Sequence, residues 1–132
     1  MTQIPIGTKG ESSLLVGADV AISFLGSDEA RVLSTPHLIG FLEWTCRNAV
    51  KPLLGEGWDT VGTRVDVKHL AATPIGMRVT FRAEVSEVDG QRVGFRVEAY
   101  DEVERVAEGA HERYIVEVAR FAKKVAAKAA GQ

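Results

Sequence analysis

The chain is short of the residues that several classes of protein require. Cys46 is the only cysteine, so no disulfide can form within the chain, and one cysteine with three histidines argues against a dedicated zinc site. No apolar run approaches the roughly 20 residues that span a bilayer. Residues 1–10 lack the basic and then apolar pattern of a signal peptide. A net charge of −2 without a basic block argues against a nucleic-acid partner. These absences predict a cytoplasmic protein that binds neither membrane nor nucleic acid.

What is present fits one domain with one core. The 132 residues are 45% apolar and 26% charged, an ordinary composition for a globular chain. No internal repeat or low-complexity linker divides them, so we expect a single domain over residues 1–132.

The first half predicts a strand and a long helix. Apolar residues alternate from Leu14 to Phe24, the period of a half-buried strand, and a loop follows over residues 25–34. Thr35 as N-cap and Pro36 at the first helical position start a helix that runs to about Leu54. Its apolar stripe comprises Leu38, Ile39, Leu42, Cys46, Ala49, Val50 and Leu53. Glu43 lies at the edge of this stripe, and Phe41 and Trp44 lie on the far side.

The second half predicts four antiparallel strands. An Asp89-Gly90 hairpin joins the middle two, a bulge is expected at Gly109, and a short helix over residues 121–130 ends the chain. In the strand that ends at His69, we expect Val61, Thr63, Val65, Val67 and His69 on the inner face and Gly62, Arg64, Asp66 and Lys68 on the outer face. The predicted fold is therefore α+β, with one long helix on a five-stranded antiparallel sheet.

Glu43 and His69 are the most informative pair. Each is a polar group on a surface that should be apolar, and each costs free energy there without a partner. Because helix and sheet pack with their inner faces together, we expect the two to meet. Glu43 can activate water or attack a carbonyl, His69 can move a proton, and Thr35 with free backbone N–H groups at the helix start can face an oxyanion.

Each of these residues also has a purely structural interpretation. Thr35 serves as an adequate cap, His69 as a hydrogen-bonded strand-end residue, and Glu43 as an exposed or ion-paired carboxylate. Cys46 is interpreted as a core residue.

Three motifs resemble the fluoroacetyl-CoA thioesterase family, which has the hot-dog fold. They are Gly40-Phe41-Leu42-Glu43-Trp44-Thr45-Cys46, His69-Leu70-Ala71-Ala72-Thr73-Pro74-Ile75-Gly76 and Gly109-Ala110-His111-Glu112-Arg113, with Gly62-Thr63 as a further match. The resemblance covers about residues 35–121.

The resemblance implies a homodimer with a continuous sheet, and an active site at the interface. It implies hydrolysis of short acyl-CoA thioesters without metal or organic cofactor. The family's catalytic residues fall on Thr35, Glu43 and His69. Its substrate-binding glycine and arginine fall on Gly62 and Arg113.

The chain departs from the fluoroacetyl-specific pattern after Thr35. Pro36-His37 replaces the Gly-Phe of those enzymes, and no phenylalanine lies in residues 25–34 to serve as their lid. We therefore expect a substrate other than fluoroacetyl-CoA, with His37 as a candidate contact for the acyl group.

Two other functions are open at this point. An enoyl-CoA hydratase is disfavoured because the chain lacks an Asp and a His five residues apart. A non-catalytic dimer that binds or senses acyl-CoA would keep the pocket without turnover.

Overall fold

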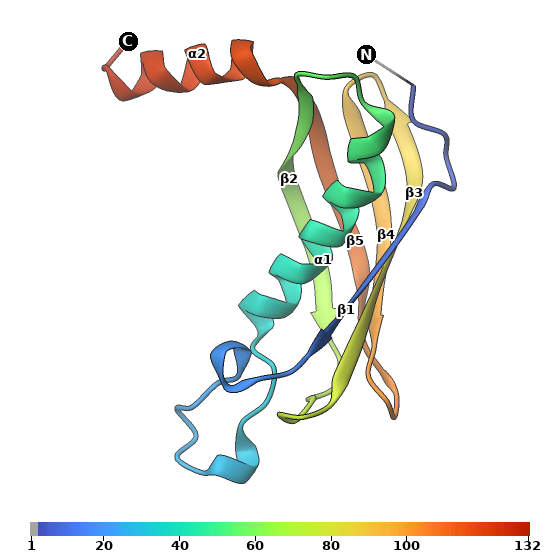
Figure 1. Ribbon diagram of the computed structural model, residues 1–132, viewed down its shortest axis with the longest axis vertical. Coiled ribbons are helices and arrows are strands. Elements are labelled where there is room, and N and C mark those ends of the chain that lie inside the picture. The colour runs from blue at the N-terminus through green and yellow to red at the C-terminus, as the bar shows by residue number, and fades with distance from the viewer. Residues whose placement is uncertain (1–2) are drawn as a thin grey trace.

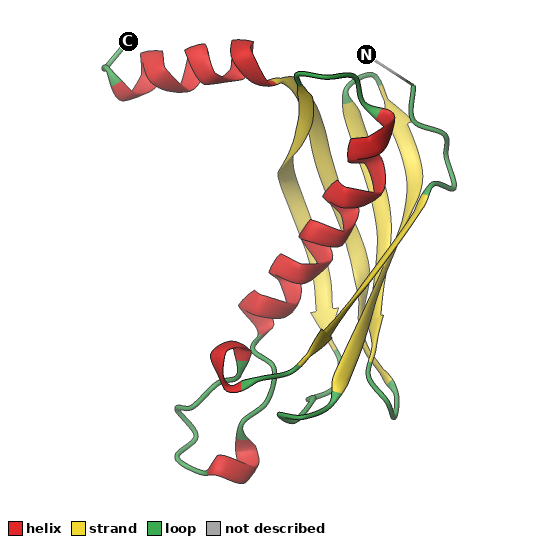
Figure 2. Ribbon diagram, in the orientation of Figure 1, coloured by secondary structure: helices red, strands yellow, loops and turns green. Residues whose placement is uncertain are grey.

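A long helix lies across the inner side of a curled antiparallel sheet (Figure 1). The computed structural model describes residues 3–132, and Figure 2 shows its helices and strands. The predicted α+β architecture and five-stranded antiparallel sheet are confirmed. In chain order the elements are β1 (Lys9–Leu15), η1 (Ala18–Val20), η2 (Asp28–Ala30), α1 (Thr35–Val50), η3 (Lys51–Leu53), β2 (Trp58–His69), β3 (Arg78–Asp89), β4 (Arg92–Tyr100), β5 (Arg105–Glu117) and α2 (Val118–Ala129).

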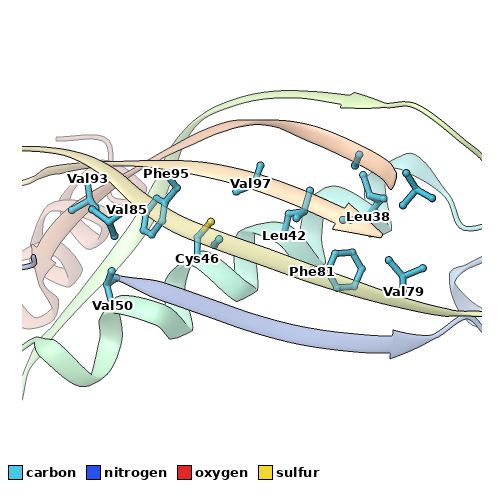
Figure 3. Packing of buried hydrophobic residues seen from close by; sticks show 14 of the residues in the cluster. Leu38, Leu42, Cys46, Val50, Val79, Phe81, Val85, Val93, Phe95 and Val97 are labelled. Atoms are coloured by element: carbon cyan, nitrogen blue, oxygen red, sulfur yellow. The ribbon is translucent and has the colours of Figure 1, made fainter. Parts of the chain in front are cut away.

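The strands are ordered β1-β3-β4-β5-β2, so β1 and β2 form the two edges. The core lies between α1 and the inner face of the sheet (Figure 3). The expected alternation of β3 and β4 is confirmed, because their buried apolar side chains occupy every second position of each strand: Val79, Phe81, Ala83, Val85, Val93, Phe95, Val97 and Ala99. None of the helices among residues 3–132 is long and apolar enough to cross a membrane.

The predicted first strand is wrong in its bounds. β1 begins at Lys9 and ends at Leu15, where its last pair is Leu15 with Arg78, the first residue of β3. Beyond that point there is no strand left to pair with. Val16 and Val20 are still buried, but Val20 reaches the core from a 3-10 turn and not from a strand.

The long helix is confirmed with three local corrections. Ser34, not Thr35, is the N-cap, and its hydroxyl oxygen accepts a hydrogen bond from the backbone N–H of His37. The α-helix ends at Val50, and the next residues form a 3-10 turn that contains Pro52, a residue that cannot donate to the helical ladder. Phe41 was placed on the far side but stacks on Phe81 of the sheet, with ring centroids 5.6 Å apart.

A β-bulge in β2 overturns the expected faces of the strand before Thr63 and leaves the expected faces after it unchanged. Gly62 pairs with Arg113 and Arg64 pairs with Glu112, so Thr63 is the extra residue. The bulge turns Gly62 toward α1, whereas Val61 pairs with the exposed Tyr114. His69 keeps its expected place on the inner side, because the alternation restarts after the bulge.

Gly109 carries no bulge, since the ladder between β2 and β5 is continuous there. Position 109 requires glycine because the backbone of β2 packs closely against it. A Cβ atom added at Gly109 would lie 2.7 Å from Cα of Val67 and would clash with the carbonyl oxygen of Asp66.

Candidate active site

Thr35 and His69 form a hydrogen-bonded pair at the N-terminal end of α1. Thr35 is the first residue of the helix, and its Oγ1 lies 2.8 Å from Nδ1 of His69, the last residue of β2. Nε2 of His69 is buried and has no hydrogen-bond partner among the described residues. Burial lowers the pKa of His69 below its usual 6.5, so the ring is neutral at pH 7. A neutral imidazole next to a hydroxyl can exchange a proton with it.

The helix start provides fewer free donors than the sequence suggested. Pro36 has no N–H, the N–H of His37 is bound by the Ser34 side chain, and the N–H of Leu38 is bound by the Ser34 carbonyl oxygen. The Thr35 N–H and hydroxyl are therefore the donors that this helix start can offer an oxyanion.

Glu43 lies beside a buried cation. Arg113 of β5 is only 6% exposed, and its Nη1 is 3.7 Å from Oε2 of Glu43. Nε and Nη2 of Arg113 donate to the hydroxyl and carbonyl oxygens of Thr60, at 2.7 and 2.9 Å. These bonds fix the guanidinium, so Arg113 presents a fixed positive charge to the half-exposed carboxylate of Glu43.

His111 lies beside Glu43 and Arg113 and acts as a neutral hydrogen-bond acceptor for Arg113. Its Nδ1 lies 2.8 Å from the carbonyl oxygen of Arg64, which can only accept, so Nδ1 carries the proton. Nε2 is then free to accept from Nη1 of Arg113 at 3.1 Å. Burial lowers the pKa of His111, and the charge of Arg113 lowers it further. The 3.9 Å approach of His111 to Glu43 is accordingly not an ion pair, and Arg113 alone supplies the positive charge.

Gly62 lies directly under Glu43. A Cβ atom added at Gly62 would overlap Oε2 of Glu43 and would lie 3.3 Å from Cε1 of His111. The absence of a side chain at Gly62 is what allows the carboxylate to approach β2.

The predicted meeting of Glu43 with His69 is wrong within one copy of the chain. Glu43 lies beside the charged Arg113 and the neutral His111, and the hydrogen-bond partner of His69 is Thr35. Thr35 and Glu43 are eight residues apart on α1, about 12 Å along the helix axis. The site therefore consists of two groups: a hydroxyl–imidazole pair and a carboxylate–guanidinium pair.

His37 and Cys46, two other residues singled out in the sequence, are held by contacts within the fold. The Ser34 hydroxyl lies 2.5 Å from Nδ1 of His37, so this imidazole is engaged at the helix cap. Cys46 is fully buried, and burial raises the pKa of its thiol to about 12. Among residues 3–132, no cluster of three or more His, Cys, Asp or Glu is arranged to hold a metal ion.

The loop before Thr35 is longer than expected and does contain a phenylalanine. Because β1 ends at Leu15, the connection spans residues 16–34 and includes Phe24, which is 80% exposed. The argument from a missing phenylalanine is therefore wrong, whereas the Pro36-His37 difference stands.

Thr60 and His111 are the residues that sequence reasoning missed. His111 was noted only as part of a motif, because the bulge expected at Gly109 left the faces of the last strand unassigned. Its spacing of two residues from Arg113 places both on one face of a strand, and this parity was the available signal. The role of Thr60 depends on the bulge in β2 and could not be read from alternation.

Comparison with known proteins agrees with this arrangement. A model of the fluoroacetyl-CoA-specific thioesterase family matches residues 16–119. The fluoroacetyl-CoA thioesterase of Streptantibioticus cattleyicolor is 40% identical over 97 residues, which are 74% of this chain and 70% of that protein. The solved structure of the fluoroacetyl-CoA thioesterase FlK is 33% identical with a TM-score of 0.86, over 96% of this chain and 98% of that one. A hot-dog-like protein from Thermanaerovibrio acidaminovorans is 27% identical with a TM-score of 0.86, over 94% and 92% of the two chains.

The family match covers most of the chain, and the helix-on-sheet architecture agrees with it. The chain therefore belongs to the fluoroacetyl-CoA-specific thioesterase family and is a hot-dog-fold thioesterase, a hydrolase of thioesters.

Proposed function

We propose that this thioesterase hydrolyses a short acyl-CoA thioester other than fluoroacetyl-CoA, releasing the free acid and CoA. The observation that carries the proposal is the carboxylate of Glu43, held between Gly62 and the buried charge of Arg113. The substitution of Pro36-His37 for Gly-Phe next to Thr35 supports a different acyl group. His37 is a candidate for contacting that group, although its ring is bound to Ser34 in the free chain.

Glu43 is the proposed catalytic carboxylate. As a general base, it takes a proton from water while the water oxygen attacks the thioester carbonyl carbon, and the C–S bond then breaks. As a nucleophile, it attacks the same carbon itself, and water cleaves the resulting anhydride. In both routes the CoA thiolate leaves and is protonated. Arg113 is therefore proposed as a residue that positions Glu43, because its donors are directed at protein atoms.

Thr35 and His69 are proposed to act on the carbonyl oxygen and the leaving group. The hydroxyl and N–H of Thr35 are suited to donate to the oxyanion, and the neutral ring of His69 is suited to transfer a proton. Their distance from Glu43 along α1 is too great for all three to act on one carbonyl in one copy. We therefore propose that Glu43 of one copy works with Thr35 and His69 of a second copy, in the homodimer expected from the sequence.

The primary test is an assay of free thiol release from a panel of short acyl-CoAs that includes fluoroacetyl-CoA. We expect one small acyl group other than fluoroacetyl to be preferred, with activity lost in Glu43→Gln and in His69→Ala. Ala72→Ser, a change at an exposed position close to His69 in the chain, serves as a folded control with expected normal activity. Saturable binding of acyl-CoA without thiol release would instead support a sensor.

Subunit mixing tests the shared site. Glu43→Gln and His69→Ala chains are refolded together in equal amounts, so that half of the dimers are mixed. If the site is shared, each mixed dimer holds one intact site, and about a quarter of wild-type activity returns. If each site belongs to one chain, the mixture stays inactive. The homodimer itself and a cytoplasmic location are further predictions from the sequence.

A further inference from the structure

The terminal helix α2 is amphipathic but has no partner for its apolar side. It leaves the end of β5 and extends beyond β2, away from the sheet (Figure 1). Val118, Phe121 and Val125 share one side of the helix at its 100° spacing and are 48%, 38% and 52% exposed. The basic residues Arg120, Lys123 and Lys124 occupy the other side, and Lys128 flanks the stripe next to Phe121. No residue of α2 is buried in the described chain, so contacts within one copy do not cover the apolar side of this helix.

The opposite end of the molecule has the complementary character. We call it the loop end, made of residues 16–34, 70–77 and 101–104 (Figure 1). It exposes the apolar residues Phe24, Leu25, Leu70, Ile75 and Val103. It also exposes the acidic residues Asp19, Asp28, Glu29, Glu102 and Glu104.

Charge distinguishes the two surfaces further. α2 holds four of the sixteen Lys and Arg residues and none of the eighteen Asp and Glu residues, so the remainder of the chain has a net charge of −6. The guanidinium of Arg31, a basic residue of the loop end, donates to backbone carbonyl oxygens of its own loop. A basic helix with an apolar stripe therefore fits an acidic end with exposed apolar residues.

The loop end of the same copy is out of reach of α2. α2 starts next to Trp58 at the beginning of β2, since Trp58 pairs with Glu117 and the Val118 N–H donates to the Gly57 carbonyl oxygen at 2.8 Å. The loop end begins after His69, twelve residues along the same strand, or roughly 40 Å away. A helix of twelve residues is about 18 Å long, and α2 runs sideways past β2 and not along the sheet toward that end (Figure 1).

A second copy brings the two surfaces together. The outer edge of β2 is unpaired in the sheet, and this open edge is where the expected homodimer would form. A two-fold axis makes the two β2 strands antiparallel, so the Trp58 end of one lies beside the His69 end of the other. α2 extends past β2 at the Trp58 end, which directs it over the loop end of the second copy.

We propose that α2 docks its apolar stripe on the loop end of a second copy of this chain, across the edge formed by β2. Leu70 directly follows His69, so the docked helix covers the end of the partner that holds the Thr35–His69 pair. The inference rests on the proposed homodimer but not on the proposed reaction.

Cross-linking between chains tests the docking. The double variant Leu70→Cys/Val125→Cys is treated with a flexible bismaleimide, and the control Ile6→Cys/Val125→Cys carries an exposed thiol at the α2 end instead. The native Cys46 is buried and does not compete. We expect the Leu70 variant to form covalent dimers roughly tenfold faster than the control, because docking raises the local concentration of one thiol at the other.

The molecular mass in solution and thiol release from acyl-CoAs are measured on the unmodified protein in parallel. If the protein is a dimer but the two variants cross-link equally fast, or neither cross-links, the docking of α2 is wrong and the homodimer stands. If the protein is a monomer, both the docking and the homodimer are wrong. Because thioester hydrolysis is scored separately, failure of the docking is not confused with failure of the proposed function.

Discussion

Replacing Gly62 by alanine separates the activity of the proposed carboxylate from the stability of the fold. The new methyl group would overlap Oε2 of Glu43, and the carboxylate would have to retreat by roughly 1 Å to regain an ordinary van der Waals contact. A displacement of this size can cost about a hundredfold in rate, equivalent to ~2.7 kcal/mol in the barrier. The side chain of Glu43 is half-exposed and free to move, and alanine favours a strand over glycine by about 0.5–1 kcal/mol. We therefore expect kcat to fall about a hundredfold with the free energy of unfolding changed by less than about 1 kcal/mol.

The assay compares kcat for the preferred acyl-CoA with urea unfolding of the same preparations. Gly94→Ala is the matched control, because a Cβ atom at Gly94 in β4 would meet its nearest neighbour, Cβ of Glu87, at 3.4 Å, at the edge of ordinary contact. Normal activity is expected there. If Gly62→Ala retains kcat within about threefold of wild type, the close approach of Glu43 to β2 is unimportant for the reaction. If it unfolds, the steric reasoning about a movable carboxylate is wrong.

Three further predictions concern stability and reactivity. Burial lowers the pKa values of His69 and His111, so the unfolded chain binds more protons than the folded one, and stability should fall as the pH drops below 6.5. The urea midpoint should therefore be lower at pH 5.5 than at pH 7.5, and His111→Asn should reduce that difference. The thiol of Cys46, with a pKa of about 12, should not react with a thiol reagent in the native protein but should react at once in urea; rapid native labelling would contradict its burial. Leu42→Ala, at a 2% exposed core position, should cost about 2–5 kcal/mol by calorimetry or urea titration, and a loss below 1 kcal/mol would mean that the core refills the space.

Alternation and capping signals predicted the fold because each strand of the hairpin β3–β4 has one buried face. Val79, Phe81, Val93 and Phe95 are all buried, and period-two patterns report this directly. The helix was also predictable, to within one residue at its start. The end of β1 was not, because it depends on where β3 begins to pair, which alternation of Leu14 and its neighbours cannot reveal.

The candidate site was predicted only in part for a related reason. Glu43 and His69 were identified correctly as polar groups on inner surfaces, but their partners depend on contacts between distant segments. Thr35 meets His69 because α1 starts over the end of β2, and Glu43 meets Arg113 because the bulge turns Gly62 inward. A bulge adds one residue without a reliable sequence signal, so the sequence could not assign these two pairs.

The extra residue at Thr63 has a consequence for how this site can vary. Gly62 and His69 are seven positions apart, an odd separation, and a regular strand would put them on opposite sides of the sheet. Both face α1 only because β2 contains one residue more than its partner between them. Deleting Thr63 would remove the bulge and leave the two residues six positions apart, an even separation that a regular strand also keeps on one side. The requirement in this strand is therefore a match between chain length and pairing. A chain without the extra residue keeps both positions on the α1 side, whereas a chain that keeps seven positions but pairs without the bulge would turn one of them to the outer surface.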